Sequence, residues 1–265
     1  MSDGDAPIIE LQRVSKSFDG LGVLDAVSLD VRRGRTTAVI GPSGCGKTVL
    51  LKHMVGLLRP DSGRVFFDGR DITHLPERKL VDVRRRIGFL FQSGALFDSM
   101  TVAENTWFPL VEHGVRDRGR LEHRCREVLR LVGLDGMQDR FPEHLSGGQR
   151  KRVALARAIA LGPDVIMYDE PTTGLDPIRA DLINELILKL QAELHTTALV
   201  VTHDMKSALK VADRVVMLYN GRILADTTPQ GLGEITDDTV VRFVEGRATQ
   251  EELDELRSGR AGAEG

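Results

Sequence analysis

The sequence predicts an α/β fold built on a mostly parallel sheet that helices cover on both faces. Short runs rich in β-branched residues, such as "TTAVIG" (36–41), "DVIMYDE" (164–170) and "TALVVTHD" (197–204), alternate with helical segments. Such runs are typical of strands buried on both faces, and the helices between them supply the crossovers that parallel strands need. The 265 residues, 41% apolar and 28% charged, suffice for a full hydrophobic core.

Other strands are indicated by partial alternation or by turn residues. They are expected within "IIELQRVSKSF" (8–18), "LDAVSLDV" (24–31), "PDSGRVFFDGRDI" (60–72), "RIGFLFQ" (86–92) and "RVVMLYNGRILAD" (214–226). The last segment predicts a hairpin, because Asn220 and Gly221 suit the two turn positions that need positive φ.

Two long helices are predicted from apolar periodicity. One covers 178–194, with an expected buried face of Leu182, Ile183, Leu186, Ile187, Leu190 and Leu194. The other covers 120–134, with an expected buried face of Leu121, Cys125, Val128, Leu129 and Val132. Its arginines fall mostly on the opposite side, which favours a solvated face over a nucleic-acid surface.

Composition argues against several classes of protein. A net charge of −3 gives no reason to expect nucleic acid or an acidic membrane surface as partner. Cys45 and Cys125 are far apart and do not suggest a disulfide framework, so a reducing compartment is expected. The start "MSDGDAP" does not resemble a signal peptide, and the apolar runs are too short to cross a bilayer.

"GPSGCGKT" (41–48) has the make-up of a phosphate-binding loop. It follows a predicted strand and precedes a helix, as this motif requires. Its glycines allow successive N–H groups to point at an anion, Lys47 can reach the β- and γ-phosphates, and the Thr48 hydroxyl can bind Mg²⁺. The expected nucleotide-binding residues are Gly41, Pro42, Ser43, Gly44, Cys45, Gly46, Lys47 and Thr48, with Cys45 as a small filler.

Polar residues follow three other predicted strands. Asp169 can hold the hydration shell of Mg²⁺, and Glu170 can orient the attacking water or accept its proton. Gln92 and His203 close two more strands. Carboxyl ends of parallel strands meet at one edge, where ligands bind in such sheets, so these groups are expected beside the phosphate loop.

A second possible anion site lies at "HLSGGQRKR" (144–152). Ser146, Gly147 and Gly148 precede a helix whose N–H groups could meet a phosphate. The next residues, Arg150 to Arg152, are positive in the first turns, which the helix dipole disfavours. A local field for phosphate could offset this, but a solvated basic face is the expected arrangement.

Taken together, these motifs resemble the ATPase subunits of ABC transporters over residues 8–244. "GPSGCGKT" is similar to Walker A, "VIMYDE" to Walker B and "LSGGQ" to the family signature, while "GLD" (174–176) matches the D-loop. The resemblance implies a P-loop NTPase fold with an N-terminal antiparallel β part and an inserted helical subdomain at about 94–160. It also implies ATP and Mg²⁺ as cofactors, Gln92 as a Q-loop residue that acts in catalysis and on the metal, His203 as the switch histidine, and Phe18 stacked on adenine where relatives usually have Tyr.

The same resemblance implies a head-to-tail dimer of two copies, with two ATP molecules between them. Each ATP would lie on one copy's phosphate loop and be closed over by Ser146, Gly147, Gly148 and Gln149 of the other. Transmembrane permease subunits would dock on the helical subdomain. Large apolar residues in 93–113 could be core or could form that docking groove: Leu96, Phe97, Met100, Trp107 and Phe108.

"GFLFQSGALFDSMTVAEN", "DEPTTGLDPI" and "KRVALARAIAL" further resemble the Mla/Mce class of lipid-transport ATPases. That resemblance implies phospholipids or related lipids as cargo, a lipid-binding Mce-type subunit as partner, and a place on the cytoplasmic face of the inner membrane. Gln149 departs from the Met common in that class, which leaves lipoprotein release or solute import open. A soluble ABC protein acting on DNA or ribosomes would usually carry two cassettes or a long coiled coil, and an ordinary P-loop kinase would lack the signature.

The tail beyond the cassette (245–265) is expected to be partly disordered, above all "RSGRAGAEG" (257–265). Before it, Thr236 could cap a short helix that ends at Gly246. So short a helix must pack on something. Its own cassette and the partner subunit are the two candidates.

Overall fold

In the computed structural model of the chain, the described residues are 6–248 and 254. The tail predicted to be disordered, 257–265, lies outside them. Within them the largest sheet has six strands in the order β10-β9-β3-β8-β7-β6. Their bounds are β3 (Thr36–Ile40), β6 (Ile87–Leu90), β7 (Val165–Asp169), β8 (Thr197–Thr202), β9 (Arg214–Tyr219) and β10 (Arg222–Thr227). All neighbours run parallel except β10 and β9, which confirms the mostly parallel sheet.

Residues in the central strands alternate between two cores, one on each face of the sheet. Met167 and Leu199 pack with α1 and the N-terminal strands, whereas Ile166 and Val200 pack with helices on the other face. The helices beside the sheet are α1 (Lys47–Met54), α2 (Glu77–Arg85), α6 (Pro177–Leu194) and α7 (Met205–Val211). Because both faces are covered, the strands read as continuous apolar runs in the sequence.

The predicted buried face of α6 needs one correction. Ile183, Leu186, Ile187 and Leu190 are buried as expected. Leu182, however, is 61% exposed, because it points away from the sheet at the edge of the apolar stripe. The helical period in the sequence does not predict which residues at the edge of an apolar face are buried.

A second, antiparallel sheet is formed in the N-terminal part, in the order β2-β1-β4-β5. Its strands are β1 (Pro7–Phe18), β2 (Leu21–Arg32), β4 (Ser62–Phe67) and β5 (Arg70–Asp71). The predicted antiparallel β part is therefore present. At the edge of the main sheet next to β2, the predicted hairpin of β9 and β10 is confirmed as well, since Asn220 and Gly221 have φ of 46° and 72°.

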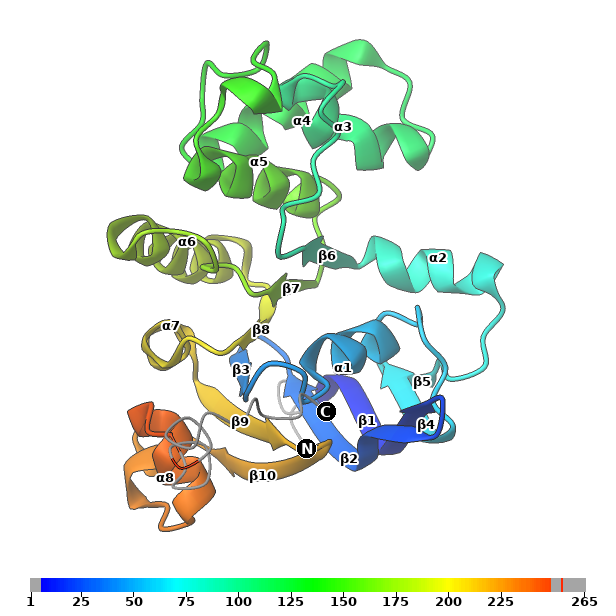
Figure 1. Cartoon of the computed structure of the whole chain (residues 1–265). Coiled ribbons are helices and arrows are strands. Elements are labelled where there is room, and N and C mark those ends of the chain that lie inside the picture. The colour runs from blue at the N-terminus through cyan, green and yellow to red at the C-terminus, as the bar shows by residue number, and fades with distance from the viewer. Residues whose placement is uncertain (1–5, 249–253, 255–265) are drawn as a thin grey trace.

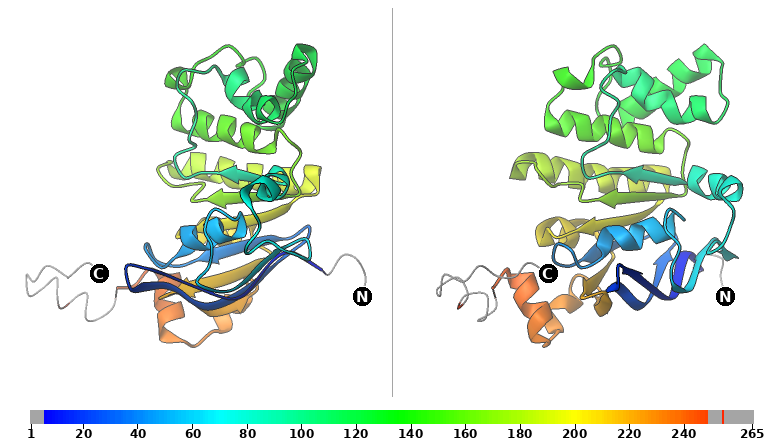
Figure 2. Two further views of the ribbon diagram at one scale, coloured as in Figure 1. Left: turned by 90° about the vertical axis from the view of Figure 1, so that its right-hand side faces the viewer. Right: turned by 45° about the vertical axis from the view of Figure 1, so that its right-hand side comes forward.

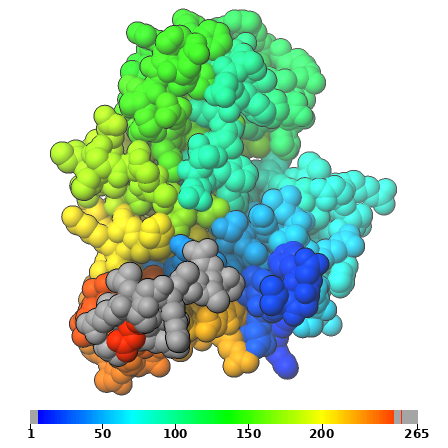
Figure 3. Space-filling view, in the orientation of Figure 1, coloured from blue at the N-terminus to red at the C-terminus, as the bar shows by residue number. Residues whose placement is uncertain are grey.

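Three helices gather at one end of the molecule, opposite the antiparallel sheet (Figures 1 and 2), and form the upper lobe in Figure 3. They are α3 (Val102–Glu112), α4 (Arg118–Leu131) and α5 (Gly147–Ile159), with the short turn η1 (Pro142–His144) before α5. The predicted face of α4, from Leu121 to Val132, is buried. The boundary of this helical part at about 94–160 stays a prediction.

The last described helix, α8 (Asp238–Glu245), follows the turn η2 (Gly231–Glu234). Val240 is fully buried, and Phe243 packs beside it against a cluster that includes residues of β3 and β9. In this chain α8 thus packs on its own cassette. It ends at Gly246 as predicted, but its N-cap is Asp237 rather than Thr236, because the Asp237 carboxylate accepts two backbone N–H groups of the first turn.

Candidate functional site: a phosphate loop beside two carboxylates

The loop between β3 and α1 requires glycine at two positions. Gly41 has φ of 151°, and a Cβ there would lie 2.1 Å from the Leu218 carbonyl oxygen. Gly46, the N-cap of α1, has φ of 105°, and a Cβ there would lie 2.9 Å from the Val23 oxygen. The chain can therefore curl tightly at the start of a helix, where N–H groups and the helix dipole favour an anion.

Lys47 places a cation inside this loop. Its amine donates to the carbonyl oxygens of Gly41 and Pro42, both at 2.8 Å, and the residue is only 7% exposed. Cys45 is also buried, and burial raises the pKa of its thiol. A buried, protonated thiol agrees with the filler role expected for Cys45, while Lys47 is held where a phosphate would lie.

Asp169, the last residue of β7, fits a divalent cation. Burial raises the pKa of its carboxyl, the neighbouring Glu170 carboxylate adds to this, and the Thr48 hydroxyl opposes it. Its Oδ1 is buried and has no hydrogen-bond partner. A carboxylate that is short of donors, beside a hydroxyl, suits Mg²⁺, which typically takes one or two carboxylates together with phosphate oxygens. The described part of the chain holds no group of three or more His, Cys, Asp or Glu side chains that could bind a metal ion by themselves.

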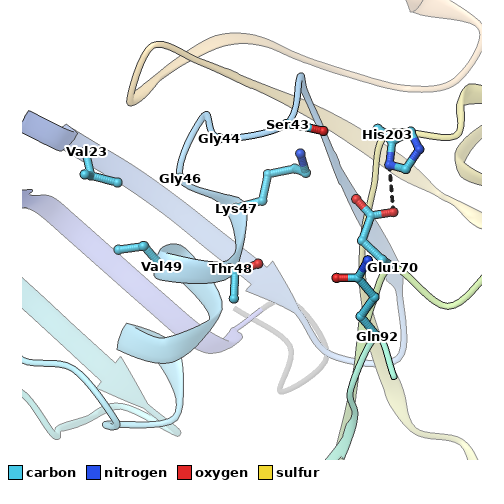
Figure 4. A pocket seen from close by; sticks show the side chains of 10 residues that line it. All are labelled: Val23, Ser43, Gly44, Gly46, Lys47, Thr48, Val49, Gln92, Glu170 and His203. Carbon is cyan, nitrogen blue, oxygen red and sulfur yellow. Dashed lines mark ion pairs between the residues drawn. The ribbon is translucent and has the colours of Figure 1, made fainter. Parts of the chain in front are cut away.

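Glu170 has an unusual backbone and a fixed side chain. Its φ is 49°, and its N–H donates to the Val201 oxygen at 2.9 Å. Its Oε2 accepts from the hydroxyls of Thr173 (3.1 Å) and Thr202 (3.3 Å). The Nδ1 of His203 lies 3.0 Å from the same oxygen, the ion pair drawn in Figure 4. Three groups thus orient one carboxylate oxygen.

His203 is itself held by the start of α7. The adjacent Asp204 caps this helix by accepting the Lys206 N–H at 3.0 Å, and it also accepts from the buried Ser207 hydroxyl at 2.6 Å. The imidazole remains 51% exposed. It can therefore contact both Glu170 and a bound anion.

The predicted groups meet in one cavity of about 300 Å³ at the carboxyl ends of the parallel strands (Figure 4). Its lining residues are Val23, Ser43, Gly44, Gly46, Lys47, Thr48, Val49, Gln92, Glu170 and His203. Sequence reasoning missed Val23 and Val49, since a valine carries no chemical signal for a nucleotide site. Gln92 comes two residues after the end of β6, not at the strand end.

Three sets of predicted site residues do not line this cavity. Gly41, Pro42, Cys45 and Asp169 belong to the same loop or strand end as lining residues but are not themselves part of the lining. The other two sets lie elsewhere in the chain. Phe18 is 41% exposed at the end of β1, on the hairpin that carries Val23, and the Lys16 amine lies 5.4 Å from its ring centre. Ser146 and Gln149 sit at the start of α5 and cap it reciprocally: the Ser146 hydroxyl accepts the Gln149 N–H, and Gln149 Oε1 accepts the Ser146 N–H. Gly147 and Gly148 form the first turn between them.

The solvated basic face expected at the start of α5 is found only in part, because Arg150 is exposed whereas Lys151 is buried and Arg152 is half-buried. Lys151 is 7% exposed, and its amine donates to the backbone oxygens of Gln92 and Glu170. Burial lowers the pKa of Lys151, although the Glu170 and Asp169 carboxylates oppose the shift. Arg150 donates to the Leu145 oxygen, and Arg152 donates to the oxygens of residues 132 and 133. These carbonyl oxygens offset the unfavourable interaction between the cations and the positive end of the helix dipole. Helical periodicity in the sequence does not reveal such contacts.

A phosphate loop, an acidic strand end and a sheet of this topology define a P-loop nucleotide hydrolase. A family profile described as "ABC transporter" matches residues 24–173. The chain belongs to the ABC transporter family, as an ATP-binding subunit that hydrolyses ATP. None of its described helices is both long and apolar enough to span a bilayer.

Relatives share most of the chain. It is 41% identical to the intermembrane phospholipid transport system ATP-binding protein MlaF of Haemophilus influenzae, covering 91% of each chain. It is also 41% identical to the probable ribonucleotide transport ATP-binding protein mkl of Mycobacterium leprae, covering 92% of this chain and 72% of the relative.

Among solved structures, the dimeric bacterial ABC cassette MJ0796 is 33% identical and has a TM-score of 0.77, covering 83% of this chain and 98% of its own. A second structure of that cassette is a post-hydrolysis dimer bound to ADP and Pi, again with a TM-score of 0.77. ABC cassettes of this type thus form dimers and bind nucleotide.

Proposed function

We propose that this chain hydrolyses ATP to power a membrane transporter of phospholipids or related lipids. The observation that carries the proposal is its 41% identity to MlaF, a phospholipid transport ATPase, over nine-tenths of both chains. The cavity supplies the groups that ATP hydrolysis needs. Transmembrane permease subunits and a lipid-binding Mce-type subunit would be its partners, at the cytoplasmic face of the inner membrane. The net charge of −3 supports no nucleic-acid role.

In this proposal the polar residues in and beside the cavity have distinct roles. Lys47 and the N–H groups of the phosphate loop bind the β- and γ-phosphates. Thr48, Gln92 and Asp169 would hold Mg²⁺, which neutralises developing phosphate charge when bound. Glu170 orients the attacking water and accepts its proton, and His203 steadies Glu170 and the γ-phosphate. Phe18 would stack on adenine after a shift toward the cavity.

Because residues 146–149 lie away from the cavity of their own chain, we propose that they close over the nucleotide of a partner copy. A helix N-terminus with exposed N–H groups suits a γ-phosphate presented from outside. Groups supplied in trans raise rates by about 10³–10⁵ in other phosphoryl-transfer enzymes. A lone subunit should therefore hydrolyse ATP very slowly.

Mixing two inactive variants tests this arrangement. Lys47→Ala removes the phosphate cation of its own cavity, and Ser146→Arg blocks the nucleotide of the partner copy by bulk and misplaced charge. A mixed dimer then has one site with both defects and one with neither. If one intact site suffices, some ATPase activity should return on mixing, measured as phosphate release. Hydrolysis at the full rate by a monomer would contradict the shared site.

A groove of about 520 Å³ supports the proposed permease contact. The rings of Phe97 and Phe108 lie 4.8 Å apart in its wall, and Phe91 is 43% exposed beside them. The buried Asn105 amide donates to three backbone oxygens of residues 97–101 and so holds Phe97 in place. A preformed apolar groove is suited to an amphipathic helix of a membrane subunit. Of the other large apolar residues expected there, Leu96 and Trp107 pack partly into the core.

Phe97→Asp should weaken binding to the permease without changing the ATPase activity of the cassette dimer. A charge in the groove would be desolvated by a docked helix, which costs about 2 kcal/mol or more. Co-purification with the permease measures the loss. Leu57→Asp is a matched control, because Leu57 is also exposed (54%) but does not line this groove. Equal retention of both variants would contradict the docking site.

The cargo is tested by purifying the chain with its membrane partners and identifying the molecules that accompany them. We expect phospholipid in the purified complex, and ATP-dependent transfer of labelled phospholipid between vesicles that stops in Glu170→Gln. A polar solute other than ATP or ADP in the complex, with no lipid transfer, would contradict lipid transport while leaving the ATPase assignment intact.

A further inference from the structure

Lys151 connects three segments that are far apart in the sequence. It lies in the second turn of α5, five residues after Ser146, and is almost fully buried. Its amine donates to the backbone oxygen of Gln92 at 2.5 Å and to that of Glu170 at 3.3 Å. These two residues follow β6 and β7, and their side chains line the nucleotide cavity.

The hydrogen bond from Lys151 to the Glu170 oxygen holds a strained part of the backbone in place. Glu170 has φ of 49°, which non-glycine residues seldom adopt. Its N–H is held by the Val201 oxygen, and its C=O accepts from Lys151 and, at 3.3 Å, from the Thr173 N–H. Such conformations persist where the surroundings over-determine them. Lys151 is the part of these surroundings that comes from α5.

The helix that carries Lys151 begins with residues 146–149, which do not reach the cavity of the same chain. An α-helix moves as a rigid rod over so short a distance, since about one and a half turns separate Ser146 from Lys151. A displacement of α5 toward or away from the sheet would therefore change both hydrogen bonds of the Lys151 amine. The Lys151 side chain therefore links the start of α5 to the backbone of both Gln92 and Glu170, whereas Arg157 of the same helix donates only to the backbone of residues 94 and 95.

We propose that Lys151 is a positioning residue that couples the two nucleotide sites of the dimer. When the start of α5 closes over the partner's nucleotide, Lys151 holds Gln92 and Glu170 of its own chain in the geometry for hydrolysis. This rests on the shared-site arrangement proposed above. Lys151 touches neither nucleotide, so its removal should change turnover more than nucleotide binding.

The first test compares three full-length variants as purified dimers. Lys151→Met keeps an unbranched side chain one atom shorter but has no donor, and it should lower kcat by about 10–100-fold, the scale of a displaced catalytic group. KM and the affinity for a non-hydrolysable ATP analogue should stay within about threefold of wild type, because Lys151 does not line the cavity. Lys151→Gln keeps two N–H donors without the charge and should recover part of kcat.

Arg152→Met is the matched control. Arg152 is the next residue of α5 and also donates to two backbone oxygens, but these belong to residues 132 and 133 in the helical part. If the loss of a hydrogen-bonding side chain loosens α5, Arg152→Met should lower Tm as much as Lys151→Met does. Its kcat should nevertheless stay near that of the wild type. Unchanged kcat in Lys151→Met, or an equal fall in Arg152→Met, would overturn the proposal.

The coupling itself is tested in mixed dimers in which one chain carries Lys47→Ala, so that only the cavity of the other chain works. Lys151→Met is then placed on the chain with the working cavity or on the Lys47→Ala chain. On the working chain, Lys151→Met removes the support of Gln92 and Glu170; on the Lys47→Ala chain, it loosens the seating of the α5 that closes over the working nucleotide. Coupling is reciprocal and therefore predicts a lower rate for both placements. A fall for the first placement alone would show that Lys151 supports only its own cavity and would overturn the coupling. If Ser146→Arg on the Lys47→Ala chain also leaves the rate unchanged, the shared site has failed instead.

Discussion

Glu170→Gln is expected to bind ATP as tightly as the wild type and to hydrolyse it about 10²–10⁴-fold more slowly, the usual contribution of a general base. The amide fills the same volume and keeps an oxygen that can accept from the Thr173 and Thr202 hydroxyls. It cannot accept a proton from water, and it loses the ion pair with His203. The variant should therefore accumulate as an ATP-bound dimer.

Two measurements establish this result. Phosphate release gives the rate, and size-exclusion chromatography with ATP gives the fraction of dimer. Glu185→Gln is the control, because it makes the same chemical change on the outer surface of α6, where Glu185 pairs with Lys210. Hydrolysis at the wild-type rate by Glu170→Gln would remove the assignment of Glu170 as the base.

The sequence predicted the polar residues of the cavity because its signals are local and the topology brings them together. The loop at 41–48 is recognisable from its glycines and lysine alone. Parallel strands end at a common edge, so Asp169, Gln92 and His203 could be placed near the loop from their positions after apolar runs. The backbone strain at Glu170 could not be foreseen, since it depends on Val201 and Lys151.

The helix α5 was predicted correctly in position but not in the surroundings of its cations. The sequence places Arg150 to Arg152 against the helix dipole, and solvent is the simplest way to accommodate them. In the structure, distant segments present carbonyl oxygens to Lys151 and Arg152, while Arg150 is exposed and donates to the oxygen of the nearby Leu145. The predicted burial of Leu182 was wrong for the converse reason: it lies within the apolar period of α6, but no element among the described residues covers it. Both cases depend on tertiary contacts that a period of 3.6 residues does not encode.

Lys47→Ala should abolish measurable hydrolysis and weaken ATP binding. The amine is buried and is held by the Gly41 and Pro42 oxygens, so little rearrangement is needed for it to meet a phosphate. Removing one partner of such a buried, hydrogen-bonded charge pair costs about 2–5 kcal/mol, and each 1.4 kcal/mol is a tenfold change in affinity. A loss of about 30-fold or more in ATP affinity is therefore expected.

Binding of a fluorescent ATP analogue, titrated in the presence of Mg²⁺, measures this loss separately from turnover. Lys52→Ala provides the comparison, because Lys52 lies on the same helix α1 but is exposed and does not line the cavity. Lys47→Arg is not expected to rescue binding, since a planar guanidinium cannot replace a compact ammonium between two carbonyls of a tight loop. Retention of wild-type affinity by Lys47→Ala would show that the loop N–H groups suffice to hold the phosphates.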